Sequence, residues 1–205
     1  DFWTPTCFGE AVIVECVLAS DAKIDDVHIV IDRLAHNYLD IPIKAAGPCN
    51  LDVTCHPDWA EAALGVGGIG TIGATGSLWC TGSLLADGNP TTSIPYFLTA
   101  NHCVGTPSKA STIEVYWLYQ TDICNGTPPS PVTVPRTTGG AEYLAGSPNT
   151  TGNDFTLLRL RNDPPPGLTY LGFATGPVEI GWGAVCIHHP SSDFKRISFG
   201  TITDN

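Results

Sequence analysis

His102 is the side chain in this sequence best placed to do chemistry. It lies in residues 95–103, which read PYFLTANHC, so an apolar strand runs into a tight turn that presents the imidazole. Cys103 beside it can tie that turn to Cys80, at the head of a neighbouring strand. A histidine that acts as a general base needs a carboxylate to orient its ring and stabilise the imidazolium. Asp154, which stands just before another core strand, is the candidate carboxylate.

The alternative pair for chemistry is His188–His189, because two imidazoles can bind a metal ion. Adjacent residues of a strand point to opposite faces of a sheet, so these two rings cannot easily reach one ion. We interpret them as structural, and we predict no metal site and no cofactor. A lone histidine or aspartate is usually a packed residue or a turn former, so the pairing of His102 with Asp154 depends on further motifs.

The elements that must position these residues are strands. Short β-type runs separated by Gly, Pro, Asn and Asp clusters predict strands at residues 77–85, 94–99, 112–120, 141–145, 155–160, 184–187 and 196–202. Many short strands without a long helical pattern indicate an all-β barrel or sandwich. Residues 57–64 are predicted to form one or two helical turns that end at Gly65.

The first part of the chain reads as a separate small β-module. Residues 10–18 and 27–32 alternate Val and Ile with polar residues around a turn, which predicts a strand hairpin. Residues 39–48 contain two prolines, one lysine and small residues, a composition typical of an exposed linker. We therefore expect two units, residues 1–44 and residues 45–205.

Composition excludes several classes of partner. The net charge is −11 and the pI is about 4.6, so the concentrated positive charge that nucleic acids and anionic membranes require is missing. The longest apolar run, residues 11–19, is interrupted by Glu15 and is too short to span a bilayer. A hydrophobic content of 42% is ample for a packed core.

The cysteines point to an oxidising compartment. Eight Cys without a C-x-x-C pair or zinc-finger spacing indicate disulfides, and therefore a secreted protein. The chain begins at Asp1, contains no Met and shows no signal segment, so we expect it to be part of a longer precursor.

At His102 and Asp154 the sequence resembles the chymotrypsin-fold serine peptidases. Further motifs, in order along residues 47–205, resemble the bacterial secreted lysyl endopeptidases; they are CNLDVTC at 49–55, CTGSL at 80–84, VYWLYQ at 115–120, DFTLL at 154–158, and IHHP with KRIS within 187–198. Ordered motifs are stronger evidence than any one of them alone.

This resemblance implies a fold and a mechanism. The fold would be a chymotrypsin-like double β-barrel, here the first barrel and the opening strands of the second, preceded by a small β-rich propeptide remnant. His102 would be the general base, Asp154 its orienting acid, and a serine the nucleophile. The substrates would be proteins or peptides, with cleavage after Lys possible, and the complete protein would be a monomer.

The resemblance also implies disulfides between Cys80 and Cys103 and between Cys55 and Cys124. Cys7 and Cys16 are close enough in sequence for a local bridge. Cys186 lies in the middle of a predicted strand, where we expect a buried thiol, and Cys49 has no obvious partner.

The nucleophile is the point at which the sequence departs from the family. In this fold the serine follows the acid in a Gly-x-Ser-Gly turn, and no such turn lies between Asp154 and Asn205. Gly146-Ser147 precedes the acid and lacks the second glycine. We expect the serine to lie beyond Asn205, so this chain alone should hydrolyse no peptide bond. The rival hypothesis is a non-catalytic secreted scaffold or binding module, a pseudoprotease that kept the barrel and lost the serine.

A peptidase that cuts after lysine could process its own linker. Lys44 is the only lysine between the predicted propeptide strands and Cys49, so we predict cleavage between Lys44 and Ala45 in this zymogen-type precursor. Amino-terminal sequencing of the mature protein should read from Ala45, and Lys44→Gln should block that start. A start at any other residue would contradict processing at this lysine.

Overall fold

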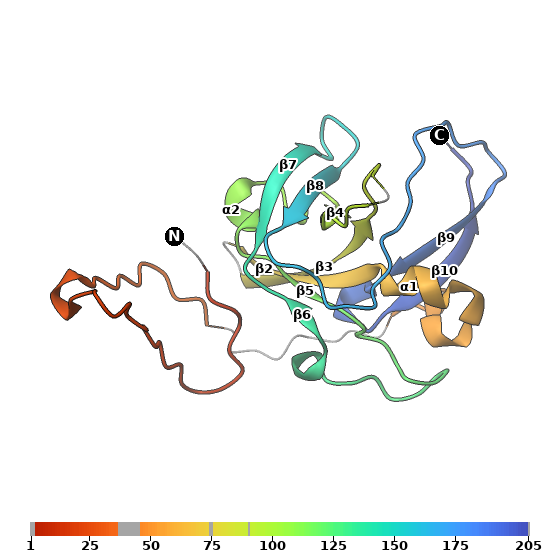
Figure 1. Cartoon of the computed structure of the whole chain (residues 1–205). Coiled ribbons are helices and arrows are strands. Elements are labelled where there is room, and N and C mark those ends of the chain that lie inside the picture. The colour runs from red at the N-terminus through yellow and green to blue at the C-terminus, as the bar shows by residue number, and fades with distance from the viewer. Residues whose placement is uncertain (1–2, 37–45, 74–75, 90, 205) are drawn as a thin grey trace.

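A computed structural model describes residues 3–36, 46–73, 76–89 and 91–204 (Figure 1). The strands are β1 (Leu51–Asp52), β2 (Val66–Gly73), β3 (Gly76–Leu85), β4 (Tyr96–Thr99), β5 (Glu114–Tyr116), β6 (Arg136–Thr137), β7 (Ala141–Ser147), β8 (Phe155–Leu160), β9 (Gly183–His188) and β10 (Arg196–Thr201). The α-helices are α1 (Ala60–Leu64) and α2 (Pro107–Ala110), and the 3₁₀ turns are η1 (Ile24–Asp26), η2 (Val53–Cys55), η3 (Pro57–Trp59), η4 (Pro131–Thr133) and η5 (Pro190–Ser192). Within these ranges, no helix has the length and apolar character needed to cross a membrane.

The expected all-β fold is confirmed. The predicted strands other than 112–120 correspond to β3, β4, β7, β8, β9 and β10. The predicted strand at 112–120 is shorter, because β5 covers Glu114–Tyr116 and Leu118 adopts a positive φ of 56° that ends extended backbone. The predicted helical turns at 57–64 form η3 and α1, with Gly65 as the C-cap.

The strands form two antiparallel sheets. One has seven strands in the order β6-β5-β2-β3-β4-β8-β7, and it curls so that α2 contacts both β2 and β7. The other has three strands in the order β1-β10-β9, of which β9 and β10 are blue in Figure 1. The molecule is thus a curled half-barrel beside a small second sheet.

Large apolar side chains fill the inside of the seven-stranded sheet. Phe97 from β4, Trp117 after β5 and Leu158 from β8 are all fully buried. The rings of Phe97 and Trp117 meet edge to face with centroids 5.9 Å apart, an arrangement that aromatic quadrupoles favour. The Trp117 indole Nε1 donates a hydrogen bond of 2.9 Å to Thr137 Oγ1, so this buried donor is satisfied.

The sequence patterns did not predict strand β2, because its glycine content is unusual for a strand. The structure shows why glycine is needed there. A Cβ atom on Gly67 would lie 2.4 Å from Val115 Cγ1, and one on Gly68 would lie 2.6 Å from Trp79 Cζ3. Bulky neighbours thus occupy the space over both faces of β2, and the strand approaches them closely because it lacks side chains at these positions.

The hairpin predicted at residues 10–18 and 27–32 is wrong. Residues 3–36 contain only η1 and otherwise form an extended loop that leaves the sheets, as the red and orange trace of Figure 1 shows. Ile13 is 94% exposed, and the other large apolar side chains there that are exposed are Phe8, Val12, Val14, Val17, Ile24, Ile29, Val30, Ile31 and Leu34. An isolated two-stranded hairpin has marginal stability in water unless a third strand or another element packs against it. None of the described residues packs against residues 10–32 in this way, so the hairpin does not form.

The β9–β10 hairpin is fixed to the half-barrel by backbone and side-chain bonds. The His189 backbone N–H donates to Thr81 Oγ1 at 2.9 Å, and the Lys195 N–H donates to the Tyr119 carbonyl at 2.7 Å. The Lys195 side chain is fully buried, and its Nζ donates to the Ala63 carbonyl at 2.6 Å. These contacts link β3, the chain after β5 and α1 to the second sheet.

Close packing over β2 predicts a clear stability effect. Gly67→Ala should lower the free energy of unfolding by about 1–3 kcal/mol, because the added methyl group overpacks against Val115. Thermal unfolding followed by circular dichroism measures this. Gly88→Ala is the matched control, since among the described residues no atom beyond its chain neighbours lies within 4 Å of a Cβ at that position. Equal melting temperatures for the two variants would contradict the packing argument.

Candidate active site

Antiparallel pairing of β4 with β8 brings His102 and Asp154 together. Thr99, the last residue of β4, pairs with Thr156 near the start of β8. His102 follows β4 and Asp154 precedes β8, so both emerge at the same end of the paired strands. Strand pairing thereby makes neighbours of two residues that are far apart in sequence.

Asp154 binds His102 through both carboxylate oxygens. Oδ2 lies 2.7 Å from His102 Nδ1, and Oδ1 accepts a hydrogen bond of 3.0 Å from the His102 backbone N–H. The Asn101 N–H also donates to the Asp154 carbonyl at 3.3 Å. Asp154 adopts a positive φ of 50°, a left-handed conformation that Asp tolerates better than most residues. The carboxylate therefore fixes both the turn and the ring.

Hydrogen bonds from the His102 side chain and backbone hold the pKa of Asp154 below its ordinary value. Asp154 is thus ionised at neutral pH, and its side chain is 30% exposed while that of His102 is 58% exposed. The interaction therefore contributes fully to the free energy of unfolding above the ordinary aspartate pKa. This contribution is lost as pH falls through the lower pKa of the folded state.

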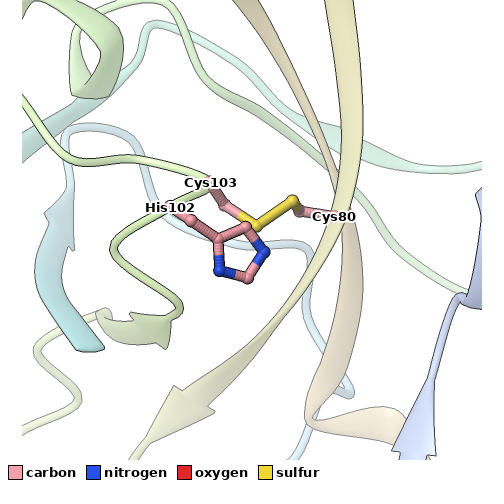
Figure 2. A group of neighbouring side chains, drawn as sticks. All are labelled: Cys80, His102 and Cys103. Carbon is pink, nitrogen blue, oxygen red and sulfur yellow. A yellow bond between two sulfur atoms is a disulfide. The ribbon is translucent and has the colours of Figure 1, made fainter. Parts of the chain in front are cut away.

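A disulfide supports the histidine from behind. Cys80 of β3 and Cys103 are bonded, and Cys103 is buried directly after His102. Figure 2 shows the imidazole lying beside this sulfur pair. The ring nitrogen of His102 and the two sulfur atoms lie within 4.8 Å of one another, which resembles a metal-ligand group. Both thiols are consumed in the disulfide, so only one histidine ligand is left and the set does not suit a metal ion.

Asn101 is a site residue that sequence reasoning did not single out. Its Nδ2 donates to Thr156 Oγ1 at 3.0 Å and lies 3.5 Å from the Tyr143 hydroxyl, which ties the histidine turn to β8 and β7. The signal was present, because Asn101 stands in the PYFLTANHC segment, but its partners become neighbours only through strand pairing.

The second disulfide joins Cys55 to Cys124. Next to it, the buried Asp52 carboxylate accepts hydrogen bonds from Thr54, Thr121 and the Asn125 backbone. Although burial raises the pKa of Asp52, these hydrogen bonds together bring it below its ordinary value. The disulfide and the carboxylate fasten the segment around β1 to the chain that follows β5.

The remaining cysteines differ from expectation. Cys7 and Cys16 are free and exposed, so the predicted local bridge is wrong; the loop that carries them folds onto nothing that would bring them together. Cys186 is also free and exposed rather than buried, because it lies in β9 on a face of the three-stranded sheet that nothing described here covers. Cys49 is a free exposed thiol as well.

His188 and His189 make separate contacts. His188 Nε2 lies 2.8 Å from Asn50 Oδ1, and burial lowers the pKa of this ring. His189 is buried, stacks on Tyr119 at a centroid distance of 5.9 Å, and binds the Asp193 carbonyl through Nδ1 at 3.1 Å. Burial, which is the largest cause, lowers the pKa of His189 to about 3, so its ring is neutral.

The processing site and the serine nucleophile are not seen among the described residues of this site. Lys44 and Ala45, the predicted processing site, are outside the described residues. In the part of the chain that is described, no serine hydroxyl hydrogen bonds to the His102 ring, and Ser147 Oγ instead accepts from the Asn153 N–H at 3.2 Å. The nucleophile is therefore not among the contacts of His102.

A histidine oriented by an aspartate on a curled antiparallel half-barrel is the arrangement of the trypsin-like serine peptidases. The chain belongs to the family described as lysyl endopeptidase, C-terminal domain, whose profile matches residues 43–205. It is 30% identical over 220 aligned residues to a lysyl endopeptidase of Pseudomonas aeruginosa, across 98% of this chain and 46% of that protein. The chain thus spans about half the length of this curated relative.

Two solved structures are more distantly similar. One is Rv3671c from M. tuberculosis in the inactive form of a serine-to-alanine mutant, with 18% identity and a TM-score of 0.41 over 80% of this chain and 61% of that one. The other is the scabies mite inactivated protease paralogue S-I1, with 18% identity and a TM-score of 0.46 over 70% of this chain and 63% of that one.

The contact between His102 and Asp154 predicts a measurable titration. In His102→Ala the pKa of Asp154 should rise toward the ordinary aspartate value, because its largest stabilising hydrogen bond is removed. Carbon-13 NMR of the Asp154 carboxyl group across acidic pH measures the midpoint. His188→Ala is the control, since that imidazole lies in β9 of the other sheet and contacts Asn50. An unchanged midpoint in His102→Ala would contradict the observed pairing.

Proposed function

We propose that this chain carries the base-and-acid half of a secreted serine endopeptidase. The observation that carries the proposal is the pair of hydrogen bonds that Asp154 accepts from the His102 ring and backbone. An exposed histidine held at two atoms by one carboxylate has a fixed orientation, which a general base needs and a surface histidine lacks. Membership in the lysyl endopeptidase family supports the same assignment.

The chemistry follows from which nitrogen carries the proton. An ionised carboxylate only accepts hydrogen bonds, so Nδ1 facing Asp154 Oδ2 is the protonated nitrogen and Nε2 keeps its lone pair. Nε2 can then take the proton of a serine hydroxyl as that oxygen attacks the peptide carbonyl. Asp154 stabilises the imidazolium that forms, and His102 returns the proton to the leaving amine.

The serine and the substrate pocket would come from the rest of the whole protein. The half-exposed His102 side chain leaves room for a nucleophile that approaches from outside the half-barrel. Because the relative is named a lysyl endopeptidase, cleavage after lysine is the specificity we propose. We also propose secretion, supported by the two disulfides, with residues 1–44 as a propeptide that is removed at Lys44 and residues 45–205 as part of the peptidase domain.

Activity of the whole protein tests this function. Asp154→Asn should lower kcat by about 10⁴-fold, because an amide favours the wrong imidazole tautomer, and His102→Ala should be at least as damaging. Hydrolysis of a lysyl amide substrate measures both effects. Asp58→Asn is the matched control, since that carboxylate is exposed and far in sequence from the site.

The 205-residue chain alone provides the complementary arm. It should hydrolyse no peptide bond at a measurable rate, because removal of a triad serine alone typically costs about 10⁶-fold in kcat. Activity of this chain that disappears in His102→Ala would mean that a nucleophile lies within it. An inactive whole protein with a well-folded His102–Asp154 pair would instead favour the scaffold hypothesis.

A further inference from the structure

A buried ion pair on the outer face of the half-barrel is unused by the proposed mechanism. Glu114 and Tyr116 of β5 lie on the same face, and Tyr116 pairs with Arg136 of β6. Glu114 is only 6% exposed, and its Oε2 accepts from Arg136 Nη1 at 3.0 Å and from the Tyr116 hydroxyl at 3.2 Å. Burial and then the charge of Glu114 raise the pKa of Tyr116 to about 12, so this hydroxyl remains a donor.

The other oxygen of Glu114 binds the start of the chain. Glu114 Oε1 accepts a hydrogen bond from the Thr6 backbone N–H, and Arg136 Nη1 donates to the Thr6 carbonyl at 3.2 Å. The Arg136 guanidinium also lies over the Phe8 ring, 4.8 Å from its centroid. One acid–base pair therefore binds both polar backbone groups of Thr6, as a neighbouring strand would. The ring of Phe8, two residues further along the chain, packs on the Arg136 cation.

The site is incomplete without this occupant. Among the described residues, Glu114 Oε1 has the Thr6 N–H as its sole hydrogen-bond partner. A buried carboxylate oxygen without a donor is costly, whereas hydrogen bonds to charged groups are stronger than neutral ones. The contact recognises backbone atoms, so it selects an extended segment rather than the side chain of Thr6.

We propose that the Glu114–Arg136 pair is a docking site for the chain's own N-terminal segment, residues 3–8, and holds this segment on the peptidase domain while the catalytic pair stays open. The second clause rests on the proposed function. In the sheet, β2 and β3 separate the docking strand β5 from β4, which leads to His102. Most of the loop between residues 9 and 36 projects away from the sheets, and the anchor of residues 3–8 is centred on Thr6 (Figure 1).

Protection of the Phe8–Gly9 bond measures the docking in the full 205-residue chain. A protease must take the residues before the cut bond as a free extended strand, so a docked Thr6 slows cleavage by added chymotrypsin. Thr6→Pro removes the N–H that binds Glu114. Cleavage at Phe8, followed by mass spectrometry and divided by the rate for a free peptide of residues 1–12 with the same substitution, should become about tenfold faster relative to wild type. Thr4→Pro is the matched control, because it also creates a Pro-Pro pair beside Pro5 but leaves the Thr6 N–H in place.

A variant on the other side of the contact completes the test. Arg136→Lys keeps a positive charge beside Glu114 but loses the planar guanidinium that binds the Thr6 carbonyl and covers Phe8, so it should also speed cleavage several-fold. Rates equal to wild type in either Thr6→Pro or Arg136→Lys would overturn docking at this pair. The assay uses an added protease, so it gives the same answer whether or not the protein is itself a peptidase.

Discussion

The pairing of β4 with β8 is the contact on which the site depends. It joins residues more than fifty positions apart, so the entropy of closing that loop must be offset by burial of the paired strands. Phe97 and Leu158, which face each other in this register, are both fully buried, whereas Leu98 between Phe97 and Thr99 is exposed. A slip of one residue would turn Phe97 outward and shift His102 by about 3.4 Å along the strand. Neither the core nor the 2.7 Å contact with Asp154 would survive that slip.

Local restraints then refine what the sheet brings together. The Cys80–Cys103 disulfide attaches the histidine turn to β3, and the side chain of Asn101 attaches it to Thr156 on β8. Asp154 adopts a positive φ, and in this conformation its carboxylate contacts both the backbone and the ring of His102. The turn is therefore held on three sides, while the face of the imidazole that would meet a substrate is left exposed.

Much of this architecture could be predicted from residue patterns. The alternation in residues 155–160 and the apolar run before His102 predicted the strands that position His102 and Asp154. Strand β2 could not be predicted, because its glycines make sense only once Val115 and Trp79 are known to lie against them. The failure at residues 10–32 has the opposite cause: the alternating pattern is present, but no partner strand or covering layer lies within the described residues. A sequence pattern indicates whether a segment tends to form a strand, but a strand forms only where the fold supplies a partner for it.

The docking contact of Thr6 also could not be anticipated, because it involves backbone atoms on one side and a buried ion pair on the other. Glu114 in an alternating strand reads as a solvent-facing residue. Its burial becomes visible only when Tyr116, Arg136 and the start of the chain are placed around it. Charged residues in short strands are thus the positions at which sequence patterns say least about this molecule.

The buried Lys195, which lies at the junction between the two sheets, makes the stability of the fold depend on pH. Burial lowers the pKa of its ammonium group to about 7, whereas an unfolded chain would keep it protonated up to about pH 10. Between these values the unfolded chain binds the extra proton, so the free energy of unfolding rises with pH. Below neutral pH the fold must enclose a charged amine that donates to the Ala63 carbonyl. Above neutral pH the same contact holds a neutral amine. Titration of Lys195 therefore makes the fold least stable below neutral pH and more stable as pH rises from about 7 toward about 10.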